Sequence, residues 1–238
     1  MTINMRLATG FGVILLMMLI LTSIGISRVS LINSNITQMT DVNAVKQRYA
    51  INFRGSVHDR AIAIRDVVLM SEKSDLDAVI ADISALDSFY QVSSTDMAKL
   101  KSEMSSTEQS LITQINQVEQ RTQPLIQDII SAKNSGDLES ASHILMTQAR
   151  PAFTQWLNVI NEFINLQEQT NQTMTQETRD IASPFKVWMI FLTGLSIIIG
   201  ISVAYIISLR IRQSVGGEPQ DAAKVIALIA QGDLTQQV

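Results

Sequence analysis

Two long stretches without a charged residue set the strongest limit on how this chain can fold. The first covers residues 7–26 and the second covers residues 187–209. A helix needs about 20 consecutive apolar residues to cross the hydrocarbon core of a bilayer, and each stretch is long enough. The whole chain of 238 residues is also 46% apolar and only 17% charged, unlike an ordinary soluble domain. We therefore expect two membrane-spanning helices, with the lipid bilayer as a partner.

The residues that flank the two stretches predict their orientation. Arg6 precedes the first stretch, Arg210 and Arg212 follow the second, and basic residues gather on the cytoplasmic side of a membrane. The alternative for the first stretch is a cleaved signal peptide. Its apolar run is too long for that and reaches Arg28 without a small-residue cleavage site. We expect an uncleaved anchor and two cytoplasmic chain ends.

The segment between the stretches is poor in residues that break helices. Residues 29–183 contain only Gly55, Gly136, Pro124 and Pro151 as glycines and prolines, and the whole chain has no cysteine. Sparse breakers argue against a turn-rich β fold, and the missing cysteines exclude disulfides and thiol chemistry. Long helices held together by their own core are the expected result.

Three helix-end signals divide this segment into four helices. The first signal is Ser74 with Asp77, and the second is Gly136 with Asp137. The third turn lies either at residues 93–95 or at residues 102–106, where Ser105 and Glu108 have capping-box spacing. A capping box marks a helix start, and a glycine before a new N-cap residue marks an end followed by a start. The first helix would run to about Ser71, and the fourth from about Leu138 into the second apolar stretch.

Apolar residues recur at steps of three and four along each predicted helix, which is typical of helices that pack in a bundle. The four seams are Ile32, Ile36 and Met39, then Ala50, Phe53, Val57, Arg60, Ile64 and Val67; Leu76, Ile80, Ile83, Asp87 and Tyr90; Leu111, Ile115, Val118, Thr122, Leu125 and Ile129; and Leu138, Ser142, Leu145, Ala149, Ala152, Trp156, Val159, Phe163, Leu166, Thr170 and Thr173. The pattern predicts an all-α fold, an antiparallel up-down-up-down four-helix bundle between two transmembrane helices.

The residues after the second stretch resemble a signal-relay module. Gly216-Gly217-Glu218-Pro219 opens a helix-like run that ends at Gly232-Asp233-Leu234-Thr235, which resembles the first half of a HAMP domain. This opening, together with Asn52-Phe53-Arg54-Gly55 and Asp59-Arg60-Ala61, resembles methyl-accepting chemotaxis proteins. We divide the chain accordingly into a cytoplasmic N-terminus at 1–6, a first span at 7–27, a periplasmic ligand-binding bundle at 28–184, a second span at 185–209 and a partial HAMP domain at 210–238.

The resemblance implies a homodimer formed through the first helix in a bacterial inner membrane, with its sensing domain in the periplasm. It also implies a cytoplasmic kinase and adaptor as partners, reached through a C-terminal part beyond Val238, so that the chain is expected to be a fragment. Family members of this kind are receptors and not enzymes. The alternative is the sensor half of a histidine kinase or nucleotide cyclase, and a third reading is a receptor that detects a ligand-loaded binding protein.

Charged residues within the apolar seams are the candidates for a ligand site. In an up-down-up-down bundle the first and third helices are parallel, and an offset of 62 residues places Arg60 level with Thr122, next to Arg121. The resulting ligand-binding candidates are Arg60, Arg121, Ser84, Asp87 and Gln117. Two guanidinium groups suit a carboxylate, so a small organic acid (a di- or tricarboxylate) is the expected ligand.

The alternative for Arg60 and Asp87 is an interhelical salt bridge, with Arg121 on the solvent side of its helix. Arg54, His58, Arg65 and Arg150 are weaker ligand candidates, and Arg54 and Arg65 are also candidates for a dimer interface. The two histidines, His58 and His143, lie on different predicted helices, so no metal site is expected. No phosphate loop or nucleophile motif is present, and we expect no cofactor, no catalytic residue and no nucleic-acid partner.

Overall fold

The computed structural model describes residues 3–215, which form helices and contain no strand. These residues fall into two compact units. The bundle unit is Ser34–Glu177, and the apolar unit joins the segment before Ser34 with the segment after Glu177. Residues 216–238, which carry most of the predicted HAMP segment, lie outside the described residues.

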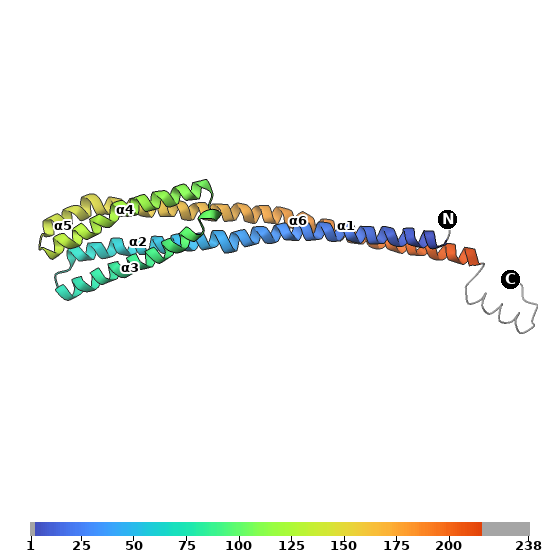
Figure 1. The fold of residues 1–238 in the computed structure, drawn as a ribbon, viewed down its shortest axis with the longest axis horizontal. Helices are drawn as coiled ribbons and strands as arrows, with labels where there is room; N and C mark the ends of the chain where they lie inside the picture. The colour runs from blue at the N-terminus through green and yellow to red at the C-terminus, as the bar shows by residue number, and fades with distance from the viewer. Residues whose placement is uncertain (1–2, 216–238) are drawn as a thin grey trace, which may run out of the picture. The chain divides into compact units, whose positions relative to one another are not determined.

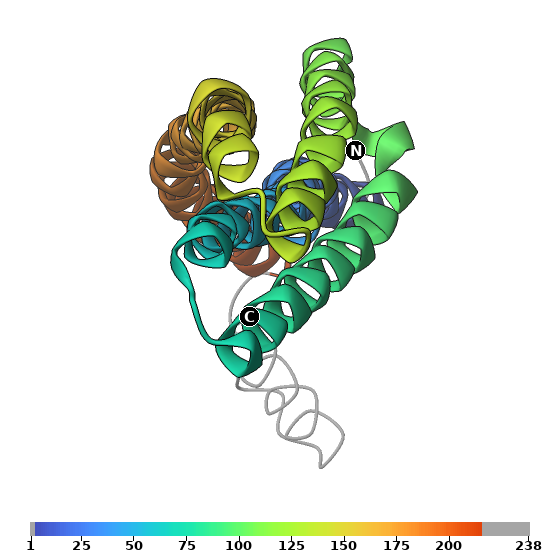
Figure 2. The same ribbon diagram turned by 90° about the vertical axis from the view of Figure 1, so that its left-hand side faces the viewer.

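The bundle unit contains four helical rods joined by three short turns (Figure 1). In chain order the elements are α1 (Ile3–Thr37), η1 (Gln38–Asn43), α2 (Ala44–Leu69), α3 (Lys73–Lys99), η2 (Lys101–Glu103), α4 (Ser106–Asn134), α5 (Leu138–Ile144), η3 (Leu145–Ala149) and α6 (Arg150–Val215). The α2–α3 turn and the α4–α5 turn lie at the same end of the bundle (Figures 1 and 2). The antiparallel four-helix bundle is confirmed.

Two of the predicted turns have the cap chemistry that the sequence indicates. The Ser105 side chain accepts a hydrogen bond from the backbone N–H of Glu108, and the Glu108 carboxylate accepts one from the backbone N–H of Ser105. This capping box decides the third turn in favour of residues 102–106. Asp137 caps α5 by accepting from the backbone N–H of Ser140 at 2.9 Å, and Gly136 before it has φ 81°.

The first predicted turn is correctly located, but its predicted cap is wrong. The helix α2 ends at Leu69 and α3 begins at Lys73, with Glu72 at the N-cap position and no side-chain cap bond. Ser74 instead lies inside α3, where its hydroxyl donates to Asp75. The end of α2 is held by a side chain of α4. The Lys133 ammonium donates to the carbonyls of Val68 at 2.9 Å and Met70 at 2.5 Å.

The predicted seams form the core of the bundle unit. Every seam position of the first helix from Ala50 to Val67 is buried. On the fourth helix the buried set is Ala141, Leu145, Ala149, Phe153, Trp156, Val159, Ile160, Phe163, Ile164 and Gln167. The predicted seam is wrong at its start, where Leu138 and Ser142 are exposed. Leu166 and Thr170 are only partly buried and Thr173 is exposed, so the predicted seam also leaves the core after Phe163.

The apolar unit consists of the first part of α1 and the last part of α6. Each carries an 18-residue apolar window that is long enough to cross a membrane, and only 6% and 0% of the two windows are buried. A core helix of a soluble protein would be mostly buried. Near one end of α1, a Cβ added to Gly10 would lie 2.8 Å from Val203 Cγ1 and 2.9 Å from Ile207 Cδ1 of α6. The two helices therefore pack closely there. The exact spans at 7–27 and 185–209 stay predictions.

Candidate functional site

Arg60 lies in the core of the bundle unit and joins three helices. Its side chain, on α2, is fully buried and donates from Nη1 to Oδ1 of Asp87 on α3 at 2.8 Å. The same carboxylate oxygen accepts from Nε2 of Gln123 on α4 at 2.5 Å. Asp87 itself is 38% exposed, so the ion pair connects the core with the bundle surface.

Aromatic rings enclose the Arg60 guanidinium. Its Cζ atom lies 5.1 Å from the ring centroid of Tyr90 and 4.9 Å from that of Trp156, within the range of cation–π attraction. Phe53 and Tyr90 also contact each other, with their centroids 4.6 Å apart. These contacts explain how a cation is accommodated at an apolar seam position.

Several donors around Arg60 have no hydrogen-bond partner among the described residues. They are Nε and Nη2 of Arg60, Oη of Tyr90 and Nε1 of Trp156. Burial lowers the pKa of the Arg60 guanidinium, against the opposing charge of Asp87. Burial and the negative charge of Glu119 raise the pKa of the Tyr90 hydroxyl, and burial raises the pKa of the Glu119 carboxyl. The side chains around Arg60, which we call the Arg60 layer, are thus polar and tightly packed, and some of their hydrogen-bond donors have no partner among the described residues.

The other predicted ligand residues lie on the outside of the bundle unit. Arg121 is exposed, and its Nε donates to the carbonyl of Gln117 on its own helix at 3.2 Å. Gln117 and Ser84 are exposed as well. The structure therefore brings Asp87 to Arg60 but does not bring Arg121, Ser84 or Gln117 into the Arg60 layer. This arrangement favours the salt-bridge interpretation of Arg60 and Asp87, while the ligand-binding role of the five residues stays a prediction.

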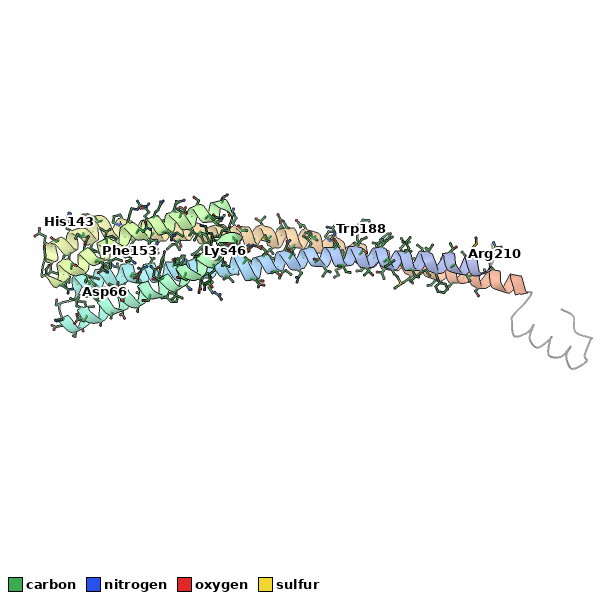
Figure 3. All side chains as sticks on the ribbon, viewed as in Figure 1. Lys46, Asp66, His143, Phe153, Trp188 and Arg210 are labelled. Carbon is green, nitrogen blue, oxygen red and sulfur yellow. The ribbon has the colours of Figure 1, made fainter. Side chains whose placement is uncertain are left out.

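A groove of about 210 Å³ lies between α2 and the fourth rod of the bundle unit. Its charged or ionisable lining residues are His58 and Arg65 from α2 and Arg150 from the start of α6. Its apolar lining residues are Ala61, Ile62, Ile64, Leu145, Met146, Phe153 and Leu157, and Thr154 completes it. Figure 3 labels Phe153 and, towards the end of the bundle that carries the α4–α5 turn, His143. The groove thus combines basic groups with an apolar surface.

Arg65 and Arg150 are free to contact a ligand. Both are exposed, and neither takes part in an ion pair within the described part of the chain. A guanidinium fork can donate two parallel hydrogen bonds to one carboxylate. Two such groups beside an apolar surface can therefore hold a small carboxylate with an apolar body.

The groove depends on a local change of helix type. Residues Leu145–Ala149 form the π-helix η3, and Pro151 lies two residues after its end. The ring of a proline clashes with the carbonyl four residues earlier, and proline has no N–H to donate to it. A π-helical turn accommodates the ring by adding one residue to the turn, and such turns are frequent at functional sites. The sequence contained this signal in Pro151, although periodicity alone does not show it.

Sequence reasoning missed a second buried polar group in the bundle unit. Lys46 on α2, Glu108 on α4 and Gln167 on α6 are all buried, and both Lys46 and Gln167 donate to the Glu108 carboxylate. The signal lay in the seam of the first helix, because Asn43 and Lys46 continue the steps of four and three between Met39 and Ala50. The Lys46–Glu108 contact joins residues 62 positions apart, which is the offset predicted for the first and third helices.

Comparison with known proteins places the chain in a family. Residues 1–182 match the model of a family described as a four-helix-bundle sensory module for signal transduction. No curated protein matches the chain. The family match covers more than half of the 238 residues and includes the first apolar stretch and the whole bundle unit. The chain therefore belongs to the four-helix-bundle sensory modules of signal transduction.

Proposed function

We propose that the chain is the input half of a transmembrane chemoreceptor that binds a small organic acid in the groove between α2 and α6. Its bundle unit would lie in the periplasm of a bacterium, and the two apolar helices would anchor it in the inner membrane. The observation that carries this proposal is a groove with two arginines that form no ion pair with any residue from 3 to 215, in a chain that belongs to a sensory family.

The charge of the bundle supports an anion as the ligand. Residues 29–183 contain 12 basic and 19 acidic side chains, so the segment as a whole repels anions. The groove is a local exception to this negative charge, because Arg65, Arg150 and His58 all line it. A groove of about 210 Å³ lies below the roughly 300–1,000 Å³ of pockets for drug-sized ligands, so it suits a small acid.

The outer face of α2 supports a homodimer. Ile51, Ile62 and Leu69 are 44%, 37% and 75% exposed, and they belong to a series spaced by four and three. The full series is Ile51, Gly55, His58, Ile62, Arg65 and Leu69, which we call the outer seam. His58, Ile62 and Arg65 also line the groove, so the proposed dimer contact would border the proposed ligand site. Seven-residue spacing of this kind is typical of a coiled-coil contact, and a second copy of the chain is the partner that we propose for it.

The mechanism that we propose is a shift in helix populations. A ligand that contacts both α2 and α6 can favour one arrangement of these helices, but only if it binds that arrangement more tightly than the other. Because α6 is a single helix from Arg150 to Val215, a displacement at the groove would be carried along its length. A cytoplasmic kinase and adaptor would respond through the residues beyond Val238.

Isothermal titration of the full chain in detergent against a panel of small carboxylates tests the ligand site. We expect one acid or a group of related acids to bind, and binding to weaken about tenfold or more in Arg65→Ala and in Arg150→Ala, because each charge-assisted bond contributes roughly 1.5–3 kcal/mol. Arg121→Ala, at an exposed arginine outside the groove, is the matched control and should bind normally.

Two results would count against the groove. Binding lost in Arg60→Ala and Arg121→Ala but kept in both groove variants would move the site to the residues predicted from the seams. No binding by any carboxylate would remove the organic-acid proposal and favour a receptor for a ligand-loaded binding protein. The type of output domain would distinguish a chemoreceptor from a sensor kinase or cyclase, because each of these classes has a different one.

A further inference from the structure

Buried polar side chains gather at one level of the bundle unit, near the α3–α4 turn. Eight polar or charged side chains are buried in the described part of the chain, and four of them lie at this level. They are Asn43, Lys46, Glu108 and Gln167, which we call the polar layer. Figure 3 shows Lys46 at this end of the bundle, away from His143. The groove proposed for the ligand lies towards the other end.

The centre of the polar layer is the carboxylate of Glu108. Its Oε1 atom accepts from the Lys46 ammonium at 2.5 Å and also from Nε2 of Gln167. Its Oε2 atom accepts from the backbone N–H of Ser105 at 2.6 Å, as part of the capping box. Lys46 donates in addition to the carbonyl of Glu103 at 3.2 Å. One carboxylate therefore ties α2 and α6 to the turn before α4.

A second contact joins the first and fourth rods directly. Nδ2 of Asn43 donates to Oδ1 of Asn171 at 3.0 Å. Asn43 precedes Lys46 by three residues, and Asn171 follows Gln167 by four, as expected for neighbouring turns of antiparallel helices. The fourth rod is thus held at two successive turns by polar contacts that depend on position.

These contacts distinguish one longitudinal position of α6 from its neighbours. A one-turn shift in one direction brings Phe163 towards the place of Gln167, and Glu108 then loses the amide that hydrogen-bonds to it. A one-turn shift in the other direction brings Asn171, whose amide is one methylene shorter, and removes Asn171 from Asn43. An apolar layer packs almost as well after such a shift, whereas a buried polar group left without its partner is costly.

We propose that the polar layer is a register lock that holds α6 at one position along α2. The charged pair costs free energy to bury, so its contribution to stability is small, and its effect is to disfavour other registers, as single buried polar residues do in coiled coils. The lock does not depend on the identity of any ligand. It makes a displacement of α6 a transition between separate positions, not a continuous movement.

Disulfide scanning of the full chain in lipid nanodiscs tests the lock, because the chain has no cysteine of its own. Met39 and Thr175 are in contact, with 3.3 Å between Sδ and Oγ1, so cysteines at these positions report the native register. Cysteines at Gln172 or Thr178, each paired with Met39→Cys, report a shift of about one turn in either direction. In the parent chain we expect the Met39/Thr175 pair to cross-link and the other two pairs to cross-link weakly.

The decisive variant replaces the lock by apolar residues: Lys46→Met, Glu108→Leu and Gln167→Leu together. We expect it to remain helical and to melt at an unchanged or higher temperature, while the ratio of shifted to native cross-links rises roughly tenfold. Phe163→Leu, an apolar exchange one turn away, is the matched control and should keep the parent ratio. An unchanged ratio in the triple variant would overturn the proposal.

A second variant covers the case in which the triple variant does not fold. Asn43→Leu with Gln167→Leu removes both polar contacts of α6 and leaves the Lys46–Glu108 pair in place. The proposal requires the shifted cross-links to increase in this variant as well, and an unchanged ratio would contradict it.

Discussion

Arg60 places a guanidinium group in the core of the bundle unit, where its side chain is fully buried. A cation at an apolar seam position is the pattern of a ligand site, but it is also the pattern of a buried ion pair. The structure gives Arg60 a carboxylate partner in Asp87 and two aromatic neighbours, Tyr90 and Trp156. Its Nε and Nη2 atoms have no partner among the described residues, so the layer is stabilised by packing and charge more than by complete hydrogen bonding.

Replacing Arg60 tests this packing role. Arg60→Ala removes a fully buried side chain from between two rings, and we expect it to lower the free energy of unfolding by about 2–5 kcal/mol. Arg121→Ala, at an exposed position, should change it by less than about 0.5 kcal/mol. Denaturant unfolding of the full chain in detergent, followed by circular dichroism, measures both. Equal effects of the two substitutions would contradict the buried role of Arg60.

The lowered pKa of Glu108 predicts that the protein loses stability in acid. Burial alone would raise the pKa of Glu108, but hydrogen bonds from Lys46, Gln167 and Ser105 outweigh it and hold the pKa below the ordinary 4.5. The folded state therefore binds this proton more weakly than the unfolded state does. The stabilisation is complete above pH 4.5 and is lost as the pH falls through the lower pKa of the folded protein.

Thermal melts between pH 7 and pH 3 would measure this contribution. Glu108→Gln should melt below the parent protein at neutral pH, and the difference should shrink as the pH falls through about 4 and below. A constant difference across this range would show that Glu108 does not titrate with a lowered pKa.

The raised pKa of Glu119 predicts that stability changes with pH in the opposite direction. Burial raises its pKa above the ordinary 4.5, although Gln91 donates a hydrogen bond to it and Arg60 lies nearby. The folded state binds this proton more tightly, so stability is lost as the pH rises through the folded pKa. Glu119→Gln should therefore melt above the parent protein at pH 7 and approach it in acid. Glu162→Gln, at an exposed position on α6, is the control and should match the parent at both pH values.

The helical elements were largely predictable because their signals are local. The periodicity of the first helix identified its buried face, and the capping box at Ser105 and the pair Gly136-Asp137 identified two of the three turns. The cap at Ser74 was wrong because α3 starts at Lys73, where a tertiary contact of Lys133 with the end of α2 helps to fix the turn. A contact between residues more than 60 positions apart cannot be found from local sequence.

The fourth helix shows a limit of seven-residue spacing. A straight α-helix has 3.6 residues per turn, so a strict repeat of 3.5 drifts around its surface by about 20° per heptad. After Phe163 the predicted positions Leu166, Thr170 and Thr173 leave the core, and Gln167 is buried instead. This drift is one reason why the polar layer was missed. The π-helical turn at Leu145–Ala149 also changes the phase of the helix before Arg150, so residue spacing alone does not identify Arg65 and Arg150 as neighbours in one groove.

Gly136 provides a test at the scale of a turn. Its φ of 81° lies in the left-handed region, where a Cβ is disfavoured, although nothing lies within 4 Å of the added atom. Gly136→Ala should therefore lower the free energy of unfolding by about 1–2 kcal/mol through backbone strain alone. Gly136→Asn, which tolerates this conformation better, should lose less. A stabilising effect of alanine would contradict the turn geometry.

At the scale of the whole molecule, the outer seam of α2 predicts a self-association surface. Ile62→Glu would place a charge within the proposed coiled-coil contact, and we expect it to weaken the dimer of the full chain at least tenfold. Phe89→Glu, at a comparably exposed position on α3 (49% against 37%), is the control and should leave the dimer intact. Sedimentation in density-matched detergent measures both. Dissociation by the α3 variant alone would place the interface elsewhere.

The bundle unit is also a part that can be transplanted, and the polar layer sets where it can be cut. A fusion of this unit to foreign membrane helices would have to keep the chain through Asn171, since an earlier junction discards a partner of Asn43. Insertions at the junction would be tolerated in steps of seven residues, which preserve the facing side of a helix, and would fail at intermediate lengths. Exchange of sensory modules between proteins, in the laboratory or in evolution, would then favour junctions that follow Asn171.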